Sequence, residues 1–396
     1  MHKFYYNVKD SWISETTSSA NYGGDPVLEL RKKYSGDTLS GVSRILTQFD
    51  LTSISASIVS NEAHSIPTDA TYYLNLYNTE ASQLSPGYRV VAQPLSQSWE
   101  EGTGQLGDNP VVSNGVTWEK SDHRTTALSW SLEDGWGWSG SRHSQGGLIG
   151  GGVWLTGSIA GGERLTAQQD FSYESPDIRI DVTGIVSAWL SGSTYNPTPT
   201  SAGGGGIPNN GFIIMYDSAS MESTSSTDRG NIKFFSRNTH TIYPPKLEVV
   251  WDDHFPALNE LTGSFTALDM SGETDNIMYV KGIKPSYKET EIVKFRVGAR
   301  EKYPQRTANT TLQTMTGSFV ADTSGSYSIR DYATGDIIVP FGDYSLLSLD
   351  SGSMYFKQDM NTFQPNRIYK ILLKIKYNDG QEHIFDNNKF QFKVVR

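Results

Sequence analysis

The sequence predicts an all-β protein, with an N-terminal jelly-roll sandwich followed by one or two immunoglobulin-like β-sandwich domains. Three observations favour this fold class. The 396 residues include 38 Gly, and 12% of the chain is aromatic, with 21 Tyr among those residues. Runs of strand length, either alternating or wholly apolar, recur between clusters of Gly, Asn, Ser and Pro. Sustained helical periodicity is hard to find.

Tryptophan content and charge divide the chain near residue 251. All nine tryptophans lie in residues 1–251. The first part holds 16 Lys and Arg against 25 Asp and Glu (16 − 25 = −9), and the second holds 17 against 18 (17 − 18 = −1). We therefore predict a domain over 1–251, a linker over 252–257 and a second region over 258–396. The second region is one domain or two small ones, over 258–305 and 306–396.

In the first part, about nine strand-like runs with long connections suit a two-sheet jelly roll better than a meander. Val182–Leu190 instead places apolar residues at helical spacing, so we expect a single short helix there. The expected strands are Lys3–Ile13, Pro26–Arg31, Ser43–Leu51, Thr71–Tyr77, Tyr88–Gln93, Asp177–Val182, Gly211–Asp217, Asn231–Ser236 and Lys246–Trp251.

The second part also predicts a β-sandwich. Leu261–Phe265 recurs loosely as Met315–Phe319, which hints at two related half-domains. The expected strands are Met278–Lys284, Glu291–Val297, Tyr327–Asp331, Asp336–Pro340, Tyr344–Leu349, Ser353–Lys357, Tyr369–Tyr377 and Phe390–Val395.

Composition argues against several classes of partner. The chain has no run of about 18 apolar residues, so we expect no membrane partner, and its start lacks the apolar core of a signal peptide. Cysteine is absent, which removes disulfides and thiolate sites. The sequence pI of about 5.2 argues against nucleic acid as a partner. The seven histidines show no metal-binding spacing, so we expect neither a metal nor a cofactor.

No catalytic pattern stands out, and we predict that the protein is not an enzyme. Glu100 and Glu101 beside Trp99 could be a glycosidase pair, but adjacent strand residues point to opposite faces, which favours a loop-anchoring role. Gly150–Gly152 lacks the lysine of a phosphate loop, and no nucleophile turn of the Gly-x-Ser-x-Gly type occurs. The segment Asp252–His254 is a candidate calcium site or a solvated hinge.

Any ligand contact is expected in a long, Gly- and Trp-rich excursion over Trp99–Gly162. The candidate residues for stacking on a ligand are Trp118, Trp130, Trp136 and Trp138, with packing in the core or a loop as the alternative role. Trp136 and Trp138 are the preferred pair, because they alternate with glycines and both indoles can emerge on one side of an extended segment.

A set of short motifs spans residues 8–251 in a fixed order. They are Asp10-Ser11-Trp12-Ile13, Asn21-Tyr22-Gly23-Gly24, Ser43–Leu51, Trp99-Glu100-Glu101-Gly102-Thr103-Gly104, Gly115–Trp118, Val182–Leu190, Asn210-Gly211-Phe212, Phe234–Arg237 and Pro245–Val249. Together they resemble the DNRLRE domain, a jelly-roll module of secreted proteins that is related to carbohydrate-binding modules. The aromatic run Asp134–Trp138 and the lack of a secretion signal depart from that family.

The general character of the second part resembles the β-sandwich appendages of bacteriophage structural proteins. The first part resembles a module of secreted proteins, yet the chain shows no export signal. A virion protein would combine these two features, because it is assembled in the cytoplasm and released by lysis. These resemblances imply a non-enzymatic virion protein at a neck, collar or tail, assembled in the host cytoplasm. Its partners would be other virion proteins, copies of itself and a host-surface glycan. The alternative is a carbohydrate-binding adhesin or accessory module of a bacterial surface protein.

Overall fold

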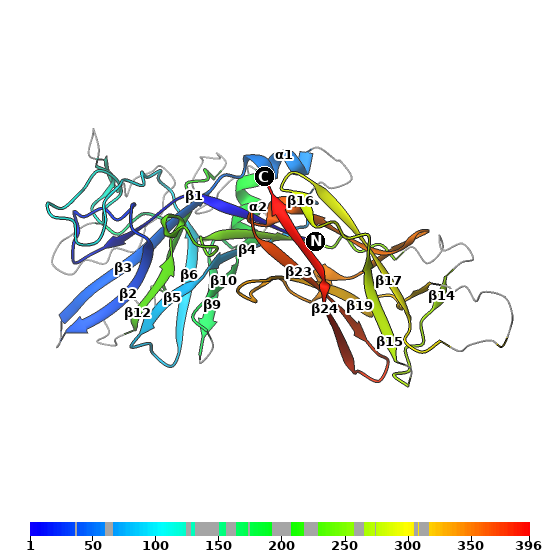
Figure 1. The fold of residues 1–396 in the computed structure, drawn as a ribbon. Helices are drawn as coiled ribbons and strands as arrows, with labels where there is room; N and C mark the ends of the chain where they lie inside the picture. Colours follow the sequence, from blue (N-terminus) through cyan, green and yellow to red (C-terminus); the bar gives the residue numbers. More distant parts are fainter. Residues whose placement is uncertain are drawn as a thin grey trace. The chain divides into compact units, whose positions relative to one another are not determined.

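The computed structural model describes residues 1–35, 38–59, 66–123, 128–130, 150–155, 164–172, 175–191, 207–217, 229–256, 265–273, 275–304, 308 and 317–396. The chain forms two compact units (Figure 1). One is Tyr5–Glu248, and the other combines Met1–Phe4 with Val249–Arg396. The first unit therefore ends at Glu248 instead of residue 251, and the first four residues belong to the second unit.

The Tyr5–Glu248 unit is built mainly from strands, and the all-β prediction is confirmed. Its elements are β1 (His2–Ser14), β2 (Val27–Ser35), β3 (Thr38–Phe49), α1 (Thr52–Val59), β4 (Thr71–Leu76), β5 (Asn78–Ser82), β6 (Tyr88–Pro94), β7 (Lys120–Asp122), β8 (Leu128–Ser129), β9 (Ala167–Phe171), β10 (Ile178–Asp181), α2 (Thr183–Ser191), β11 (Phe212–Tyr216), β12 (Gly230–Phe235), the 3-10 turn η1 (Arg237–Thr239) and β13 (Lys246–Val250). β1 and β13 each cross the boundary between the two units.

The long strand β3 organises this unit. It pairs with β1, β2 and β11, so the path β10-β4-β13-β1-β3-β11-β6-β9 meets the branch β2-β12-β5 at β3. β11 is buried along its whole length, whereas β12 alternates between buried and half-buried residues. A strand that is covered on both faces has a continuous run of apolar residues, whereas a strand that is covered on one face has apolar and polar residues in alternation. These are the two patterns from which the strands were predicted.

Two α-helices occur among the described residues, and the prediction of a single helix was therefore incomplete. Asp181 Oδ1 accepts a hydrogen bond from the Thr183 N–H at 2.9 Å at the start of α2, which is the predicted helix. Asp50 Oδ1 accepts from the Thr52 N–H at 2.9 Å at the start of α1 in the same way. Side-chain oxygens at these positions satisfy free N–H groups of the first turn. The same pattern, an Asp followed by an apolar residue and a Thr, stands at the start of both helices. This pattern is the feature of the sequence from which α1 could have been predicted.

The second unit is a sandwich of two sheets. One sheet has the order β14-β18-β17-β22-β21, with β15 also paired to β17, and the other has the order β16-β24-β23-β19-β20. The elements are β14 (Thr266–Ala267), β15 (Asn276–Lys281), β16 (Ser286–Lys288), β17 (Ile292–Glu301), β18 (Ser318–Phe319), β19 (Gly325–Asp331), β20 (Ile337–Val339), η3 (Asp343–Ser345), β21 (Ser348–Asp350), β22 (Ser353–Asp359), η4 (Met360–Thr362), β23 (Ile368–Lys376) and β24 (Glu382–Val395).

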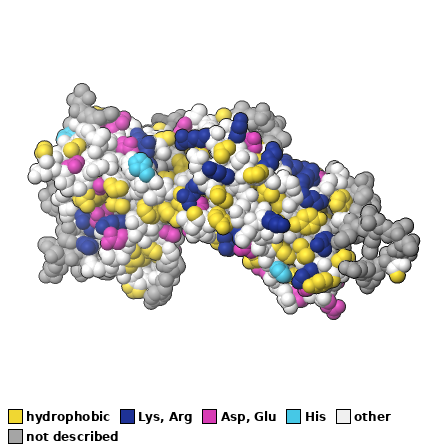
Figure 2. Space-filling view, viewed as in Figure 1, with side chains coloured by type: hydrophobic (Ala, Val, Ile, Leu, Met, Phe, Trp, Pro, Cys, Tyr) yellow, Lys and Arg dark blue, Asp and Glu magenta, His cyan; other side chains and the backbone are white. Residues whose placement is uncertain are grey.

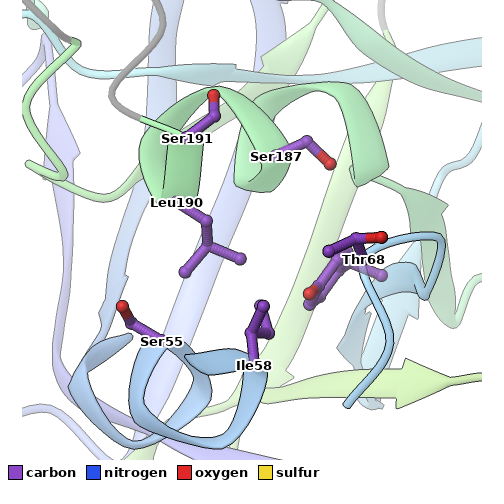
Figure 3. Close-up of a pocket in the computed structure, with 7 residues that line it drawn as sticks. Ser55, Ile58, Thr68, Ser187, Leu190 and Ser191 are labelled. Carbon is purple, nitrogen blue, oxygen red and sulfur yellow. The ribbon is translucent and has the colours of Figure 1, made fainter. Parts of the chain in front are cut away.

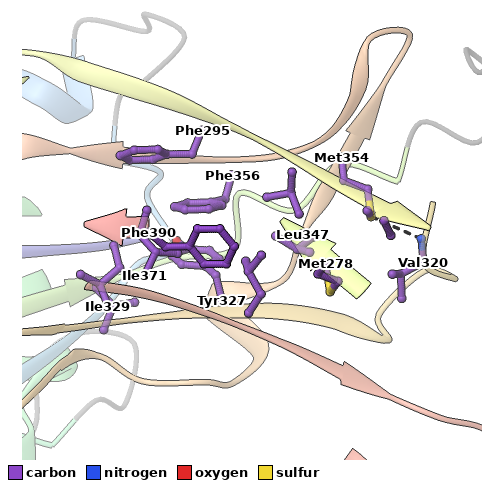
Figure 4. Packing of buried hydrophobic residues seen from close by; sticks show 14 of the residues in the cluster. Met278, Phe295, Val320, Tyr327, Ile329, Leu347, Met354, Phe356, Ile371 and Phe390 are labelled. Atoms are coloured by element: carbon purple, nitrogen blue, oxygen red, sulfur yellow. Dashed lines mark hydrogen bonds between the residues drawn. The ribbon is translucent and has the colours of Figure 1, made fainter. Parts of the chain in front are cut away.

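One hydrophobic core fills this sandwich. Figure 4 shows Phe295 and Phe356 from one sheet and Tyr327 and Ile371 from the other within the same layer. Phe356 stacks on Tyr327 with ring centroids 3.9 Å apart, and on Phe295 at 5.0 Å. Because the core includes side chains from β15 to β24, the region is one domain, and the option of two small domains is not what the structure shows.

Two sequence predictions in this unit differ from the structure. The expected strand Tyr344–Leu349 is the 3-10 turn η3 followed by the short β21. β24 begins at Glu382, well before the expected start at Phe390, because its polar first half is held to β23 by backbone pairing. The first echoed run ends at Phe265, directly before β14, and the second ends in β18; β14 and β18 lie side by side as parallel strands of one sheet. They do not form two separate half-domains.

Candidate functional site

Several motifs that carry the DNRLRE resemblance meet at one place in the Tyr5–Glu248 unit. Asp10–Ile13 lies in β1, Asn21–Gly24 follows β1, Trp99–Gly104 follows β6, and Phe234–Arg237 ends β12. Hydrogen bonds join these segments across up to 227 residues of sequence. We call this set of four segments the motif cluster.

Asn21 fastens the 99–116 loop at the motif cluster. Its Nδ2 donates to the carbonyl oxygens of Glu101 and Val116, each at 2.7 Å. Its Oδ1 accepts from the N–H groups of Gly104 at 2.9 Å and Gly23 at 3.2 Å. Asn21 is buried, and its amide therefore uses both donors and both acceptor sites on backbone groups.

Close backbone approach explains the glycines of these motifs. An added Cβ at Gly23 would lie 1.9 Å from the Glu101 carbonyl oxygen, and one at Gly104 would lie 2.3 Å from that of Asn21. Gly102 also has a positive φ of 78°. Side chains at these positions would push the 99–116 loop off the sandwich.

Replacing Gly23 with alanine is expected to lower the free energy of unfolding of this unit by about 2 kcal/mol, because two backbone segments must separate. Gly87→Ala is the matched control, since the nearest heavy atom to its added Cβ is 3.9 Å away. Urea unfolding monitored by tryptophan fluorescence measures both variants. Equal stability of the two variants would show that the loop does not need this close approach.

A β-bulge places Asn7 and Asp10 on the same face of β1. Asn7 pairs with Phe49 and Lys9 with Gln48, so one residue between them is unpaired. Side chains alternate between the two faces of a strand, and an extra residue shifts that alternation by one. Asp10, three residues after Asn7, therefore points to the same side.

Asp10 is buried at the centre of the motif cluster. Its Oδ2 accepts hydrogen bonds from Asn7 Nδ2 at 2.6 Å and from the Arg237 N–H at 2.9 Å. Its own N–H donates to Glu101 Oε1 at 2.9 Å. Within the described part of the chain, Asp10 Oδ1 and Asn7 Oδ1 have no hydrogen-bond donor. Burial raises the pKa of Asp10 to about 7, and the nearby charge of Glu101 adds to the rise.

Glu101 has the loop-anchoring role that the sequence favoured over a glycosidase pair. Besides holding the Asp10 N–H, its carboxylate lies 3.4 Å from Arg237 Nη1. Arg237 also donates to the Val8 carbonyl. The neighbouring Glu100 uses its N–H on the Ser121 carbonyl at 3.1 Å. The motif cluster is therefore a set of interlocked loop contacts.

The candidate tryptophans divide into two groups. Trp118 is fully buried, and Trp130 is 4% exposed and donates from Nε1 to the Thr117 carbonyl at 3.1 Å. Their rings belong to the core, which is the packing role weighed against ligand stacking, and a ligand cannot reach them in this structure. Trp136 and Trp138 lie outside the described residues, and their binding role stays a prediction.

A buried arginine organises the tryptophan core. The Arg44 guanidinium carbon lies 4.9 Å from the ring centroids of both Trp118 and Trp154. Its Nη1 donates to the Gly151 carbonyl. Gly151 has a φ of 87°, and an added Cβ there would lie 2.4 Å from Arg44 Nη1. The run Gly150–Gly152 thus covers a packed arginine, a structural role in place of phosphate binding.

A half-open pocket of about 210 Å³ lies between α1 and α2. Figure 3 shows Leu190 of α2 and Ile58 of α1 pointing toward one another across it. Burial raises the pKa of the lining Tyr72 to about 12, so its phenol is neutral at ordinary pH. The lining residues are Ser55, Ile58, Thr68, Tyr72, Ser187, Leu190 and Ser191. This uncharged lining suits a small neutral molecule.

The acidic segment after β13 has protein partners within the second unit. The Met1 ammonium donates to Asp253 Oδ1 at 2.7 Å, and His254 Nε2 lies 2.6 Å from Asp322 Oδ1. Asp252 Oδ1 accepts the His254 N–H at 2.8 Å. Across the residues that the structure describes, no group of three or more His, Asp or Glu side chains is arranged to hold a metal ion. Neither described helix is long and apolar enough to cross a membrane.

Comparisons with known proteins give no assignment. No family model and no curated protein match the sequence. One solved structure that matches is an FMN-binding beta-glucuronidase from Facaelibacterium prausnitzii L2-6, at 10% identity and a TM-score of 0.14. The match covers 100% of this chain and 39% of that one, so the chain spans less than half of that protein. A TM-score this low carries no argument, and the DNRLRE resemblance stays a prediction.

Proposed function

We propose that the protein is a non-enzymatic structural protein of a bacteriophage virion, exposed on the particle as a neck, collar or tail appendage. It is assembled in the host cytoplasm with other virion proteins and copies of itself. The motif cluster is the observation that carries this proposal. Asn21, Glu101 and Arg237 hold loops against the sandwich with their polar groups, which suits a rigid contact scaffold.

The motif cluster achieves this rigidity without disulfides, since the chain contains no cysteine. A protein that folds in a reducing cytoplasm and then works outside the cell needs stability that does not depend on oxidation. Buried hydrogen bonds between distant segments, such as those of Asn21 and Asp10, provide such stability. The proposal therefore accounts for a structure of this kind in a cysteine-free chain.

Purified phage particles are expected to contain this chain at a fixed ratio to the other virion proteins. Mass spectrometry of gradient-purified particles measures that ratio, and a reconstruction of the particle would locate the chain. The supernatant of uninfected, unlysed cells is the control. Finding the chain there, with none in particles, would overturn the virion proposal.

A carbohydrate-binding adhesin or accessory module is the alternative. The pocket between α1 and α2 favours it, because the hydroxyl groups of Ser55, Thr68 and Ser187 form no hydrogen bond with a described residue. Hydroxyl groups and an aliphatic wall suit a neutral sugar. Glycan-array binding by the full chain, lost in Leu190→Trp, would support this alternative over the first proposal.

A further inference from the structure

One face of the second unit exposes apolar and basic side chains together. In the sheet β20-β19-β23-β24-β16, Ile337 pairs with Arg330, Arg330 with Lys370, and Ile368 with Lys393. The alternate residues Ile329, Ile371 and Phe392 point into the core, so this set points outward. We call the outward set the outer face. Its exposed or half-exposed members are Lys288, Arg330, Tyr332, Ile337, Ile368, Lys370, Lys374, Lys376, Glu382, Ile384, Asp386, Gln391 and Lys393. The same side of the sheet also holds Ser326, Ser328 and Leu372, which are buried.

Large apolar side chains are concentrated on the outer face. Tyr332 is 51% exposed, Ile337 55%, Ile368 43% and Ile384 46%. These are four of the 11 large hydrophobic side chains that are exposed in the described part of the chain. Tyr332 and Ile368 are neighbours, since the Tyr332 N–H donates to the Ile368 carbonyl at 2.9 Å. Grouped exposed apolar residues with a polar rim are typical of protein-binding surfaces.

The outer face carries a net positive charge. It holds six Lys or Arg against two Asp or Glu, a net charge of +4 (6 − 2), within a unit whose 18 basic and 18 acidic residues cancel. Lys370 and Lys374 pair with Asp386 and Glu382. The remaining four cations form no ion pair with a described residue. They are Lys288, Arg330, Lys376 and Lys393. Figure 2 shows Lys and Arg side chains gathered with hydrophobic ones over β16, β23 and β24.

The outer face has the size of a small protein interface. The five strands have 3, 14, 9, 7 and 3 residues, and at about 3.3 Å per residue and about 4.8 Å between strands they span about 570 Å². A standard interface buries about 800 Å² on each partner. The face is therefore of the size of a small interface between two folded proteins, which suits a weak, salt-sensitive contact.

We infer that the outer face binds the acidic surface of a second copy of this chain. The whole chain has a net charge of −10, so the residues outside the face carry −10 − 4 = −14, which is opposite in sign to the face on every copy. Two outer faces would repel each other, and the contact is therefore heterologous, joining different surfaces of the two copies. Such contacts build rings or open chains.

The apolar centre distinguishes this partner from a nucleic acid or an anionic polysaccharide. Ile368 and Tyr332 lie between the cations, and apolar groups surrounded by charged ones are the usual arrangement of protein interfaces. A polyanion is bound mainly through contiguous Lys and Arg. The inference deepens the proposed virion role, in which the chain assembles with itself, but its test needs no particle.

Sedimentation velocity of the full chain tests the inference. At about 0.05 M salt the mean mass is expected to rise with protein concentration, and at about 0.5 M salt the chain should be monomeric, since salt screens the charges. Lys376→Glu with Lys393→Glu, and separately Tyr332→Ser with Ile368→Ser, should each raise the dissociation constant tenfold or more. Lys302→Glu and Tyr303→Ser are matched controls, because both side chains are exposed outside the face and should leave association unchanged.

Three results would overturn the inference. They are a monomer at every concentration in low salt, association that neither pair of variants weakens, and retention of a monomeric chain on dextran sulfate or duplex DNA that the variants abolish. The last result would assign the face to a polyanion. A monomeric chain that is nevertheless found in particles overturns this inference alone, and a self-associating chain that is absent from particles overturns the virion role alone. Circular dichroism confirms that each variant is folded.

Discussion

Replacing Trp118 with alanine is expected to lower the free energy of unfolding of the Tyr5–Glu248 unit by about 3–5 kcal/mol. The indole is fully buried among Trp99, Trp130 and Trp154. The Trp118 carbonyl lies 2.3 Å and its ring 2.7 Å from the position of an added Cβ at Gly150, so the surrounding backbone fits this residue closely. A cavity here would also leave the buried Arg44 guanidinium without one of its two aromatic partners.

Urea unfolding monitored by tryptophan fluorescence measures this loss, because eight of the nine tryptophans lie in this unit. Trp118→Phe should lose less, since a smaller ring still fills part of the space. The indole Nε1 has no partner in the described residues, so little of the loss comes from a hydrogen bond. Unchanged stability in the alanine variant would contradict the core assignment and return Trp118 to the set of candidate ligand contacts.

The strands of the Tyr5–Glu248 unit could be predicted because their apolar patterns are local. The sequence of β11 is wholly apolar, and in the structure all its residues are buried. The sequence of β12 alternates between apolar and polar residues, and its residues alternate between buried and half-buried. The first half of β24 could not be predicted, since it is polar and depends on pairing with β23. α1 has a weak apolar pattern, and only the Asp50 cap distinguishes it from a loop.

The motifs of the motif cluster could be recognised separately in the sequence, but the sequence did not show that they contact one another. Asp10 and Glu101 are 91 residues apart, and nothing local to either residue indicates the contact. The shared face of Asn7 and Asp10 depends on a β-bulge, which a strict alternation of residues misses. The burial of Trp118 and Trp130 likewise depends on distant segments, which is why their packing and ligand-binding roles stayed open at the level of sequence.

Replacing Asp10 with asparagine is expected to stabilise the Tyr5–Glu248 unit at about pH 8 and to have little effect near pH 4. The folded-state pKa of Asp10 is about 7, above its unfolded value of 3.8, because burial disfavours the charged form. The carboxylate therefore destabilises the fold. This penalty is absent below pH 3.8, grows as the pH rises toward 7, and is complete above it. About three pKa units correspond to roughly 4 kcal/mol, and we expect a gain of about 2–4 kcal/mol.

The geometry around Asp10 supports the same direction. The oxygen of the introduced amide can accept from Asn7 Nδ2 and the Arg237 N–H, as Asp10 Oδ2 does now. Its nitrogen would then take the place of Asp10 Oδ1, which accepts no hydrogen bond from a described residue, so no existing contact is lost. Asp10→Ala is the control. It loses both accepted hydrogen bonds and should destabilise the unit near pH 4, where Asp10 is neutral, because the partly buried Arg237 N–H is left without an acceptor. At about pH 8 it also loses the charge penalty, but it should remain less stable than Asp10→Asn.

Urea unfolding of wild type, Asp10→Asn and Asp10→Ala at a series of pH values separates the charge of Asp10 from its packing. The difference in the free energy of unfolding between wild type and Asp10→Asn should increase as the pH rises from about 4 to about 7 and then become constant. A difference that is constant over this range would mean that Asp10 titrates as it does in the unfolded chain. The buried, hydrogen-bonded arrangement of the motif cluster around Asp10 would then be wrong, and with it the account of how the 99–116 loop is held.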